Sequence, residues 1–262
     1  MPIWITVVLL GIVEGITEFL PVSSTGHLLI AEHWLPRQTD LFNVVIQCGA
    51  VLAVLPLFPD RLRQFFFRWR EPATRDYLLK IVVACAITGA PGYLLEKKKF
   101  KLPEQLQPVA IALFVGGVLF IIVETWLRNR PLKNDITWPI VIAVGIGQLI
   151  AAVFPGTSRS GATILLALAL GLNRVAATEF TFLVGIPTML AAGGLKIVKS
   201  LRHYGGPPAE DWQMVALGFL VSSVVSFIAV KWLLQYVRTH TFIAFGWYRI
   251  AISILIGILL YF

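Results

Sequence analysis

Charged side chains are scarce in this sequence. Asp, Glu, Lys and Arg make up 14% of the 262 residues, whereas hydrophobic residues make up 57%. Soluble domains have about a quarter of their residues charged. A soluble globular domain is therefore disfavoured, and apolar runs long enough to cross a bilayer recur along the chain. This pattern predicts an integral membrane protein.

Acidic residues are fewer than basic residues: there are 14 Asp and Glu and 22 Lys and Arg, which give a net charge of +8. This excess does not indicate a nucleic-acid partner. The basic residues lie in short loops between apolar runs, as expected beside anionic lipid headgroups. The expected partners are therefore membrane lipids, and no nucleic acid.

Cysteine is nearly absent, and a leader segment is not evident. Cys48 and Cys85 both fall within apolar runs, which disfavours a structural disulfide and a cysteine metal site. The N-terminus, Met-Pro-Ile-Trp-Ile-Thr, has no basic region and no small-residue cleavage site. We therefore expect no removable signal peptide.

Two polar breaks interrupt the apolar chain. Regions 4–35 and 138–171 are each long enough for two half-length helices, broken at Pro21–Gly26 and Pro155–Gly161. Such a break cannot face lipid, because its backbone groups would lack hydrogen-bond partners. Each region is therefore predicted to form a re-entrant helix hairpin, buried against spanning helices. The six predicted spans are 41–59, 77–95, 105–127, 178–198, 212–236 and 242–262.

These elements predict an all-α polytopic membrane protein with a single domain, 1–262. Repeat one covers about 4–127 and repeat two about 138–262, and each has one re-entrant hairpin plus three transmembrane helices. An odd number of spans per half turns the second half upside down. This is the inverted-topology repeat, in which broken helices meet near the membrane midplane.

The two breaks are copies of one stretch, 134 positions apart and aligned without a gap. The first copy holds two carboxylates and a histidine, whereas the second holds a lone arginine. This division predicts one site built from two halves, suited to a metal and an anionic group together. The aligned pairs are Gly11 with Gly145, Glu14 with Gln148, Pro21 with Pro155, and Ser24 with Ser158.

The loops favour one orientation weakly. An arginine-rich loop and a second basic loop lie on one side, and the positive-inside rule puts that side in the cytoplasm. The first hairpin then enters from the outer side. The basic residues of this side are Arg61, Arg63, Arg68, Arg70, Arg75, Arg128, Arg130 and Lys133; those of the other side are Lys97, Lys98, Lys99, Lys101, Lys196, Lys199 and Arg202.

Glu14 and Glu18 are the candidate metal ligands. Four residues apart on a helix, their Cβ atoms lie about 5–6 Å from each other. Buried carboxylates this close repel unless a proton or cation intervenes, and Mg²⁺ commonly uses one or two carboxylates plus substrate phosphate. Gly11 and Gly15 share the face and allow another backbone to approach. The alternative is that both glutamates are capping or packing residues.

Ser23, Ser24 and Thr25 precede a helix predicted from His27 to about Trp34. A hydroxyl there caps the helix, and the free N–H groups can bind an anion. Capping explains one hydroxyl but not three. His27, beside glutamates and serines, is a candidate acid, base or nucleophile. The alternative is a structural histidine.

Arg159 lies between Ser158 and Ser160, just after a Pro-Gly break. An arginine at mid-membrane costs about 2.5–3.5 kcal/mol, and its guanidinium suits bidentate phosphate contact. The alternative is a salt bridge to Glu14 or Glu18 that holds the two halves together.

These residues resemble a known family. The stretch Glu14-Gly-Ile-Thr-Glu18-Phe-Leu-Pro-Val-Ser-Ser24-Thr-Gly-His27 is similar to the first signature of the bacterial undecaprenyl-diphosphate phosphatases, linked to bacitracin resistance. Pro155-Gly-Thr-Ser158-Arg159-Ser160-Gly-Ala-Thr163 is similar to their second signature. The span pattern extends the resemblance over the whole chain. One departure is Asn43, where the family often has an acidic residue.

The resemblance implies an enzyme of the bacterial inner membrane that removes the terminal phosphate of undecaprenyl diphosphate and so recycles the lipid carrier for cell-wall synthesis. It implies a divalent metal, Mg²⁺ or Ca²⁺, and a site opening to the periplasm. Ser24 is the preferred nucleophile with His27 assisting, although His27 or a metal-bound water stays open. Arg159 with Ser23, Thr25, Ser158, Ser160 and Thr163 would bind the diphosphate.

Two further expectations accompany this interpretation. The apolar groove between the repeats would take the prenyl chain, and two copies of the chain would form a homodimer. The rival function is a transporter or flippase of the lipid phosphate, since inverted repeats with broken helices are also a transporter architecture.

Overall fold

The structure, a computed structural model, describes residues 1–97, 105–202 and 211–260. Within these ranges the regular structure is α-helical, apart from one isolated pairing of Lys133 with Leu172. The all-α prediction is confirmed. In chain order the α-helices are α1 (Ile3–Thr17), α2 (Ser24–Trp34), α3 (Asp40–Val54), α4 (Pro59–Phe67), α5 (Pro72–Lys97), α6 (Leu106–Leu127), α7 (Trp138–Val153), α8 (Arg159–Ala169), α9 (Arg174–Arg202), α10 (Trp212–Tyr236) and α11 (Ile243–Leu259), with a short 3-10 helix, η1 (Leu55–Leu57), after α3.

Five helical segments are long and apolar enough to cross a membrane: Asp40–Leu57, Pro72–Leu95, Leu106–Leu127, Arg174–Lys199 and Trp212–Tyr236. They coincide with five of the six predicted spans. The sixth corresponds to α11, whose 17 residues extend about 26 Å, close to the ~30 Å hydrocarbon core of a bilayer. The described chain therefore has the helices of a multi-pass membrane protein.

Some helices begin earlier than their apolar runs. Helix α9 starts at Arg174 rather than near residue 178, because the Asn173 side chain caps it by accepting the N–H of Ala176 at 2.9 Å. Helix α5 likewise starts at Pro72 rather than 77, since proline suits the first turn. The predicted residues Lys98, Lys99, Lys101 and 261–262 lie outside the described ranges.

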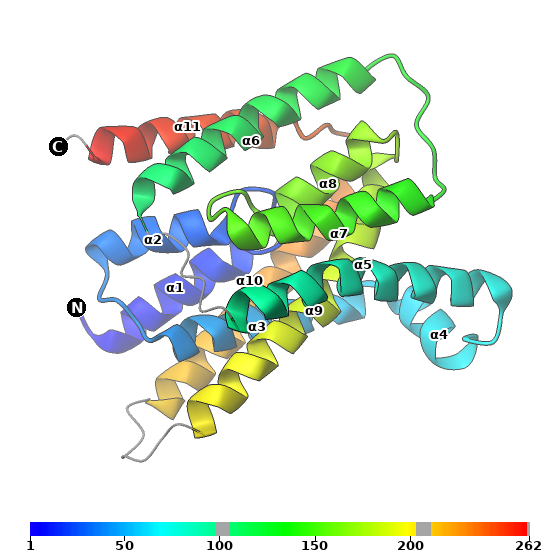
Figure 1. Cartoon of the computed structure of the whole chain (residues 1–262). Helices are drawn as coiled ribbons and strands as arrows, with labels where there is room; N and C mark the ends of the chain where they lie inside the picture. The colour runs from blue at the N-terminus through cyan, green and yellow to red at the C-terminus, as the bar shows by residue number, and fades with distance from the viewer. Residues whose placement is uncertain (98–104, 203–210, 261–262) are drawn as a thin grey trace.

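The two interrupted regions form helix pairs, as predicted. Helices α1 and α2 pack together, and so do α7 and α8. In Figure 1, α1 begins and α2 ends on the side of the N-terminus, whereas α7 begins and α8 ends on the opposite side. The turn inside each pair therefore lies within the molecule, where the two turns can meet.

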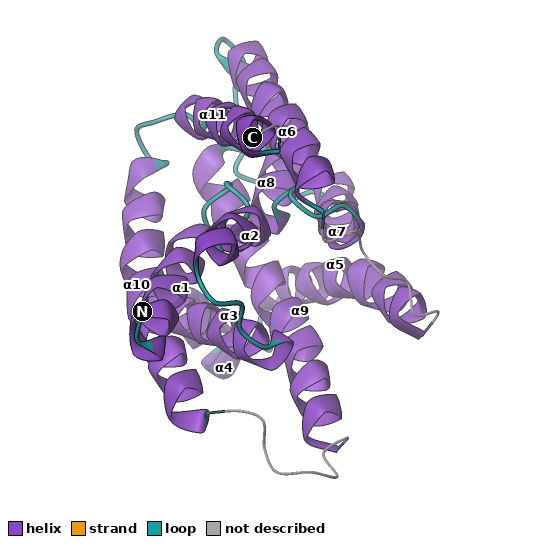
Figure 2. Cartoon of the chain, turned by 90° about the vertical axis from the view of Figure 1, so that its left-hand side faces the viewer, coloured by secondary structure: helices purple, strands orange, loops and turns teal. Residues whose placement is uncertain are grey.

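Glycines allow the helices to approach closely, as is common between membrane helices. A Cβ added at Gly117 in α6 would lie 2.6 Å from Gly246 O in α11, and one at Gly15 in α1 would lie 2.7 Å from Ser222 O in α10. Helix α11 lies beside α6, and α10 lies beside α1, in both Figure 1 and Figure 2. The expected close approach at Gly11 and Gly15 is confirmed, since Gly11 likewise faces Gly218 O of α10, 3.1 Å from its added Cβ.

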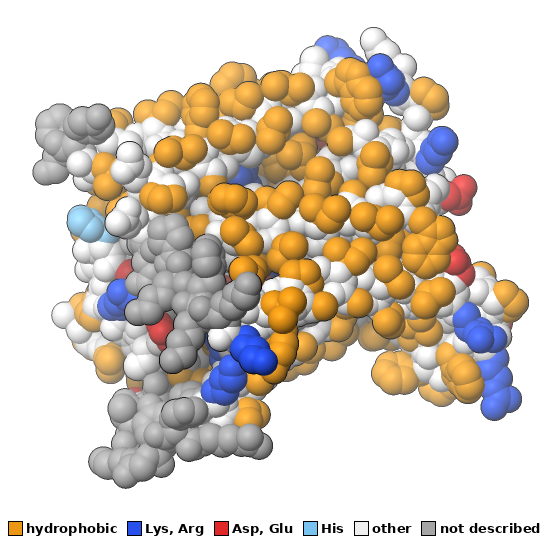
Figure 3. All heavy atoms as spheres, viewed as in Figure 1, with side chains coloured by type: hydrophobic (Ala, Val, Ile, Leu, Met, Phe, Trp, Pro, Cys, Tyr) orange, Lys and Arg blue, Asp and Glu red, His pale blue; other side chains and the backbone are white. Residues whose placement is uncertain are grey.

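The molecular surface is apolar in the middle and basic toward its ends. Figure 3 shows hydrophobic side chains over the centre of one face, with most Lys and Arg side chains toward the two ends. Large exposed residues of this kind include Ile111, Leu220 and Ile228. A surface of this composition suits contact with lipid.

Candidate active site

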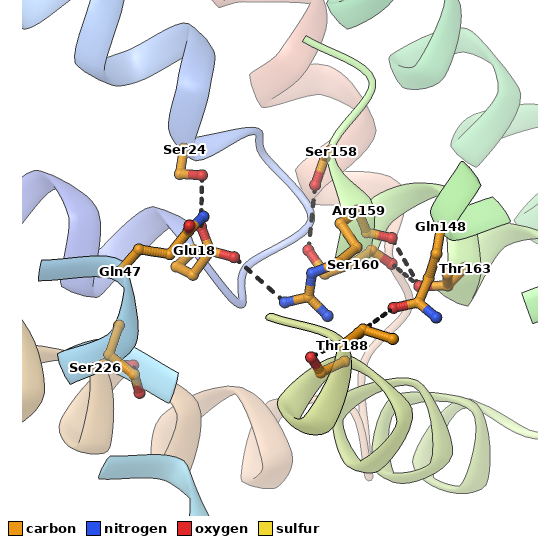
Figure 4. A network of polar contacts seen from close by, with 12 residues as sticks. Glu18, Ser24, Gln47, Gln148, Ser158, Arg159, Ser160, Thr163, Thr188 and Ser226 are labelled. Carbon is orange, nitrogen blue, oxygen red and sulfur yellow. Dashed lines mark hydrogen bonds and ion pairs between the residues drawn. The ribbon is translucent and has the colours of Figure 1, made fainter. Parts of the chain in front are cut away.

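The two broken helix pairs meet inside the protein. The turn after α1 contains Phe19 and Leu20, which are 0% and 9% exposed. Ser160, in the first turn of α8, donates its hydroxyl hydrogen to Leu20 O at 3.0 Å. Segments about 140 residues apart in the chain thus come into direct contact, and Figure 4 shows the polar side chains between them.

A serine caps each re-entering helix in the same way. Ser23 Oγ accepts the N–H of Gly26 at 3.3 Å, and Ser158 Oγ accepts the N–H of Gly161 at 3.1 Å. Both serines have a positive φ, 74° and 68°, which is uncommon for residues other than glycine. Each cap satisfies one N–H group of its helix, and other N–H groups of a first turn can bind an anion.

This geometry corrects the gapless alignment of the two copies. Ser158 is the structural equivalent of Ser23, and not of Ser24, because the second copy has one more residue between its helix glycine (Gly145, matching Gly11) and its cap. Arg159 is therefore the equivalent of Ser24, and both are the first residues of their helices. The prediction that α2 begins at His27 was also wrong, since the helix starts three residues earlier.

Glu18 connects the two turns and is 5% exposed. Ser24 donates its hydroxyl hydrogen to Glu18 Oε2 at 2.7 Å, and Arg159 Nη2 donates to Glu18 Oε1 at 3.3 Å. Gln47 of α3 makes a longer contact, 3.4 Å, to Oε2. The predicted acidic, hydroxyl and guanidinium groups therefore converge on one carboxylate (Figure 4).

Two buried polar atoms at this site lack a hydrogen-bond partner within the described part of the chain. Glu14, one helical turn before Glu18, is 2% exposed, and its Oε2 is unpaired; Arg159 Nη1 is also unpaired. Unpaired buried groups of this kind are uncommon and need an explanation. A carboxylate oxygen suits a cation and a guanidinium suits an anion. The donor set therefore fits Mg²⁺ or Ca²⁺ together with a phosphate.

A polar cavity of about 260 Å³ adjoins Glu18 and Arg159, whereas Glu14 is not among the residues that line it. Its lining includes Glu18, Ser23, Ser24, Thr25 and Arg159. Ser158 also lines it, with Gln47, Thr88, Gln148 and Thr188 from the surrounding helices. Most of the residues predicted to bind a diphosphate thus share one cavity.

Comparison with known proteins shows the family of this chain. Residues 7–255 match the family model described as bacitracin resistance protein BacA. The chain belongs to this family. A relative named undecaprenyl-diphosphatase, from Rhizobium etli, is 52% identical over 254 residues, which cover 97% of this chain and 96% of the relative. Another of that name, from Xanthomonas axonopodis pv. citri, is 48% identical over 250 residues, covering 95% and 94%.

His27 lies apart from the polar cavity of this BacA-family chain. Its Nδ1 is 2.7 Å from Ser23 O, and its Nε2 is 2.8 Å from the Tyr248 hydroxyl of α11. The two rings also stack, with centroids 5.6 Å apart. Ser24 donates to Glu18, both His27 ring nitrogens have other partners, and no Ser24–His27 hydrogen bond is formed in this arrangement. The assisting role of His27 stays a prediction.

Two of the predicted phosphate ligands make internal contacts instead. Thr163 donates to the carbonyls of Arg159 and Ser160, at 2.7 and 3.2 Å, as helix hydroxyls often do. Ser160 is 0% exposed and bonds Leu20 O, with Ser158 Oγ 3.1 Å away. These hydroxyls hold the turns in place, and neither lines the cavity.

Sequence reasoning missed three side chains that complete the site. Gln47 contacts Glu18, Tyr248 contacts His27, and Arg249 binds both turns from α11. A signal existed for Arg249, because an arginine within an apolar helix is expensive and usually functional. Gln148, which the gapless alignment pairs with Glu14, has its amide held by Thr88 at 3.1 Å and Thr188 at 2.9 Å.

Proposed function

We propose that this chain hydrolyses undecaprenyl diphosphate to undecaprenyl phosphate and inorganic phosphate, and so recycles the lipid carrier for cell-wall synthesis. The printed names of the relatives support this substrate. The proposal rests mainly on the hydrogen bonds that Ser24 and Arg159 both donate to Glu18. Beside them lie two unpaired buried atoms: Glu14 Oε2, which suits a cation, and Arg159 Nη1, which suits an anion.

Ser24 acts as the nucleophile in this proposal. Its Oγ attacks the terminal phosphorus, and its proton moves to Glu18 Oε2, the atom that already accepts it at 2.7 Å. The bridging P–O bond breaks, and undecaprenyl phosphate leaves with the electron pair. Water then attacks the phosphorus of the phosphoserine, and the P–Oγ bond breaks. Ser24 Oγ takes back the proton held by Glu18, and inorganic phosphate leaves with both hydrogens of the water. Glu18 thus takes the base role first considered for His27.

Arg159 binds the diphosphate through Nη1, which has no partner within the described residues. The N-termini of α2 and α8 add N–H donors. Charge that develops on the phosphoryl oxygens is stabilised most where donors are fixed in advance and water is excluded. Arg159 is held by Glu18 on one side and by the Phe19 ring, 5.5 Å from its Cζ, on another.

Glu14 and Glu18 would hold the divalent cation, Mg²⁺ or Ca²⁺. When bound, such an ion neutralises phosphate charge. No group of three or more His, Cys, Asp or Glu side chains with metal-site geometry occurs among the described residues. The two carboxylates would therefore share the ion with phosphate oxygens, an arrangement common for Mg²⁺.

The prenyl chain occupies a second, apolar cavity of about 730 Å³ between α6 of the first half and α7 and α8 of the second. Pro155 and Thr157 line this cavity, whereas Gly156 and Ser158 line the polar one. The turn before α8 thus separates the two compartments. A lipid with its head at Arg159 can lay part of its tail across this turn into the apolar cavity.

We further propose an inverted-topology repeat in the bacterial inner membrane, with the polar cavity opening to the periplasm. Support comes from the opposite directions of the α1–α2 and α7–α8 pairs in Figure 1 and from their matching serine caps. The basic loops at the end remote from the N-terminus favour a cytoplasmic location for that end. The homodimer stays a prediction, testable by the mass of the purified protein in detergent.

Phosphate release in detergent tests the activity. Without a second compartment transport is impossible, so release of phosphate from undecaprenyl diphosphate identifies an enzyme. The flippase alternative has no support in the names of the relatives described above. Lipid movement across proteoliposomes without phosphate release in detergent would favour it instead.

A further inference from the structure

Arg249 of α11 is a completely buried cation, 0% exposed. Among the described residues its guanidinium donates only to backbone carbonyls: Nε to Leu113 at 3.4 Å, Nη1 to Pro21 at 3.1 Å, and Nη2 to Ala112, Gly156 and Thr157 at 3.2, 3.4 and 3.0 Å. These acceptors come from α6 and from both turns of the broken helix pairs.

No carboxylate balances this charge, since none of the ion pairs among the described residues includes Arg249. Burying an unpaired charge is costly, and apolar side chains of similar volume often stabilise a protein better than buried ions. Stability alone therefore does not account for an arginine here. Charged residues inside membrane segments usually serve the function.

The carbonyls that Arg249 binds flank the reacting groups. Pro21 lies three residues before Ser24, and Thr157 lies two residues before Arg159. One rigid, planar guanidinium therefore joins the turn that carries Ser24 to the turn that carries Arg159. The bonds to Ala112 and Leu113 fix that guanidinium against α6.

Two glycines form the space that the guanidinium fills. A Cβ added at Gly116 in α6 would lie 2.2 Å from Arg249 Nη2, and one added at Gly161 in α8 would lie 2.8 Å from Nη1. Neither position can take a side chain unless Arg249 moves. The backbone is thus shaped around this particular side chain.

We propose that Arg249 is a positioning residue that sets the separation between Ser24 and Arg159. It contacts neither the diphosphate nor the reacting atoms, although its side chain also lines the apolar cavity proposed for the prenyl chain. This inference rests on the proposed phosphatase activity, because a fixed separation matters only if the hydroxyl and the guanidinium act on one diphosphate. The rate of the chemical step is then sensitive to the carbonyl contacts of Arg249.

The test compares two variants with two matched controls. Arg249→Lys keeps the positive charge but loses the planar guanidinium that binds carbonyls of both turns. Gly116→Ala keeps Arg249 but adds a methyl group where the guanidinium lies. Arg174→Lys makes the same change at an arginine that binds Glu124 instead. Gly257→Ala adds a methyl group on α11 where no atom lies within 4 Å.

We expect kcat for phosphate release, per folded enzyme, to fall about tenfold to a hundredfold in Arg249→Lys and Gly116→Ala, as for a small displacement of reacting groups. KM should change less than kcat, and both controls should stay within about twofold. If Arg249→Lys does not fold, Gly116→Ala decides the question. Wild-type kcat in both variants would overturn the proposal.

A double-mutant cycle excludes a merely structural role. In an Arg159→Lys background, Arg249→Lys should cause a much smaller further loss of kcat, because the contact that it positions is already impaired. Equal fold losses in both backgrounds would overturn the positioning role. A wild-type enzyme that releases no phosphate would instead refute the proposed function, which keeps the two failures distinct.

Discussion

Gly185 of α9 provides the sharpest test of Arg159. A Cβ at this position would lie 1.7 Å from Arg159 Nη1 and 2.8 Å from Cζ. Real Cβ contacts are essentially never shorter than 3.0 Å, so Gly185→Ala must displace Nη1 by more than about 1 Å, a misplacement that can cost about a hundredfold in rate. Nη1 is also the atom that we propose grips the diphosphate.

The fold should tolerate this change. The three atoms nearest to the added Cβ all belong to the end of the flexible Arg159 side chain, which can swing away without moving a helix. Alanine in place of glycine also favours the helix by about 0.5–1 kcal/mol. The melting temperature in detergent should therefore stay within a few degrees of wild type while kcat/KM falls about a hundredfold.

Gly194→Ala is the matched control, because it lies on the same helix with no atom within 4 Å of the added Cβ. It should retain full phosphate release. In an Arg159→Ala background, Gly185→Ala should have no further effect, since the displaced group is gone. Wild-type kcat/KM in Gly185→Ala would refute the claim that catalysis needs Arg159 Nη1 in this place.

Three further predictions concern the groups around Glu18. Phosphate release should require Mg²⁺ or Ca²⁺ and stop with excess EDTA; full activity in EDTA would exclude the metal role of Glu14 and Glu18. Ser24→Ala should lower the rate by at least about a hundredfold, and near-normal turnover would move the nucleophile to His27 or water. Arg159→Lys should remain folded but lose about a hundredfold in activity. If Arg159 only links the two halves, lysine should preserve turnover and Arg159→Ala should mainly lower the melting temperature.

Much of the fold could be predicted from the sequence, because backbone polar groups that face lipid must form hydrogen bonds within their own segment. Apolar runs of spanning length must be helical, so α3, α5, α6, α9 and α10 were found from hydropathy. The polar breaks had to be buried, and the meeting of Ser160 with Leu20 follows from that requirement. The Glu18–Arg159 contact corresponds to the alternative interpretation of Arg159, an ion pair between the halves, rather than to the phosphate contact that the sequence favoured.

The remaining features depend on contacts between distant segments. His27 and Tyr248 are 221 positions apart, and nothing local predicts that they stack. The position of the caps depends on how the chain leaves α1 and α7, so a gapless alignment missed the extra residue before Ser158. Ser24 donates to Glu18 and not to His27 because of the direction in which its side chain points. The spacing of these residues in the sequence does not predict that direction.

The shared geometry of the N-termini of α2 and α8 has a consequence for the orientation in which the diphosphate binds. A diphosphate contains two linked phosphate groups. In the proposed mechanism they bind at two similar helix N-termini, which are capped by Ser23 and Ser158. The backbone alone therefore cannot distinguish the terminal phosphate from the inner one. The first residue of each helix makes the distinction. The Ser24 hydroxyl can attack a phosphorus atom, whereas the Arg159 guanidinium can only bind a phosphate group. In the proposed mechanism, the side chains of Ser24 and Arg159 therefore decide which phosphate is released, because the backbone around them is nearly the same.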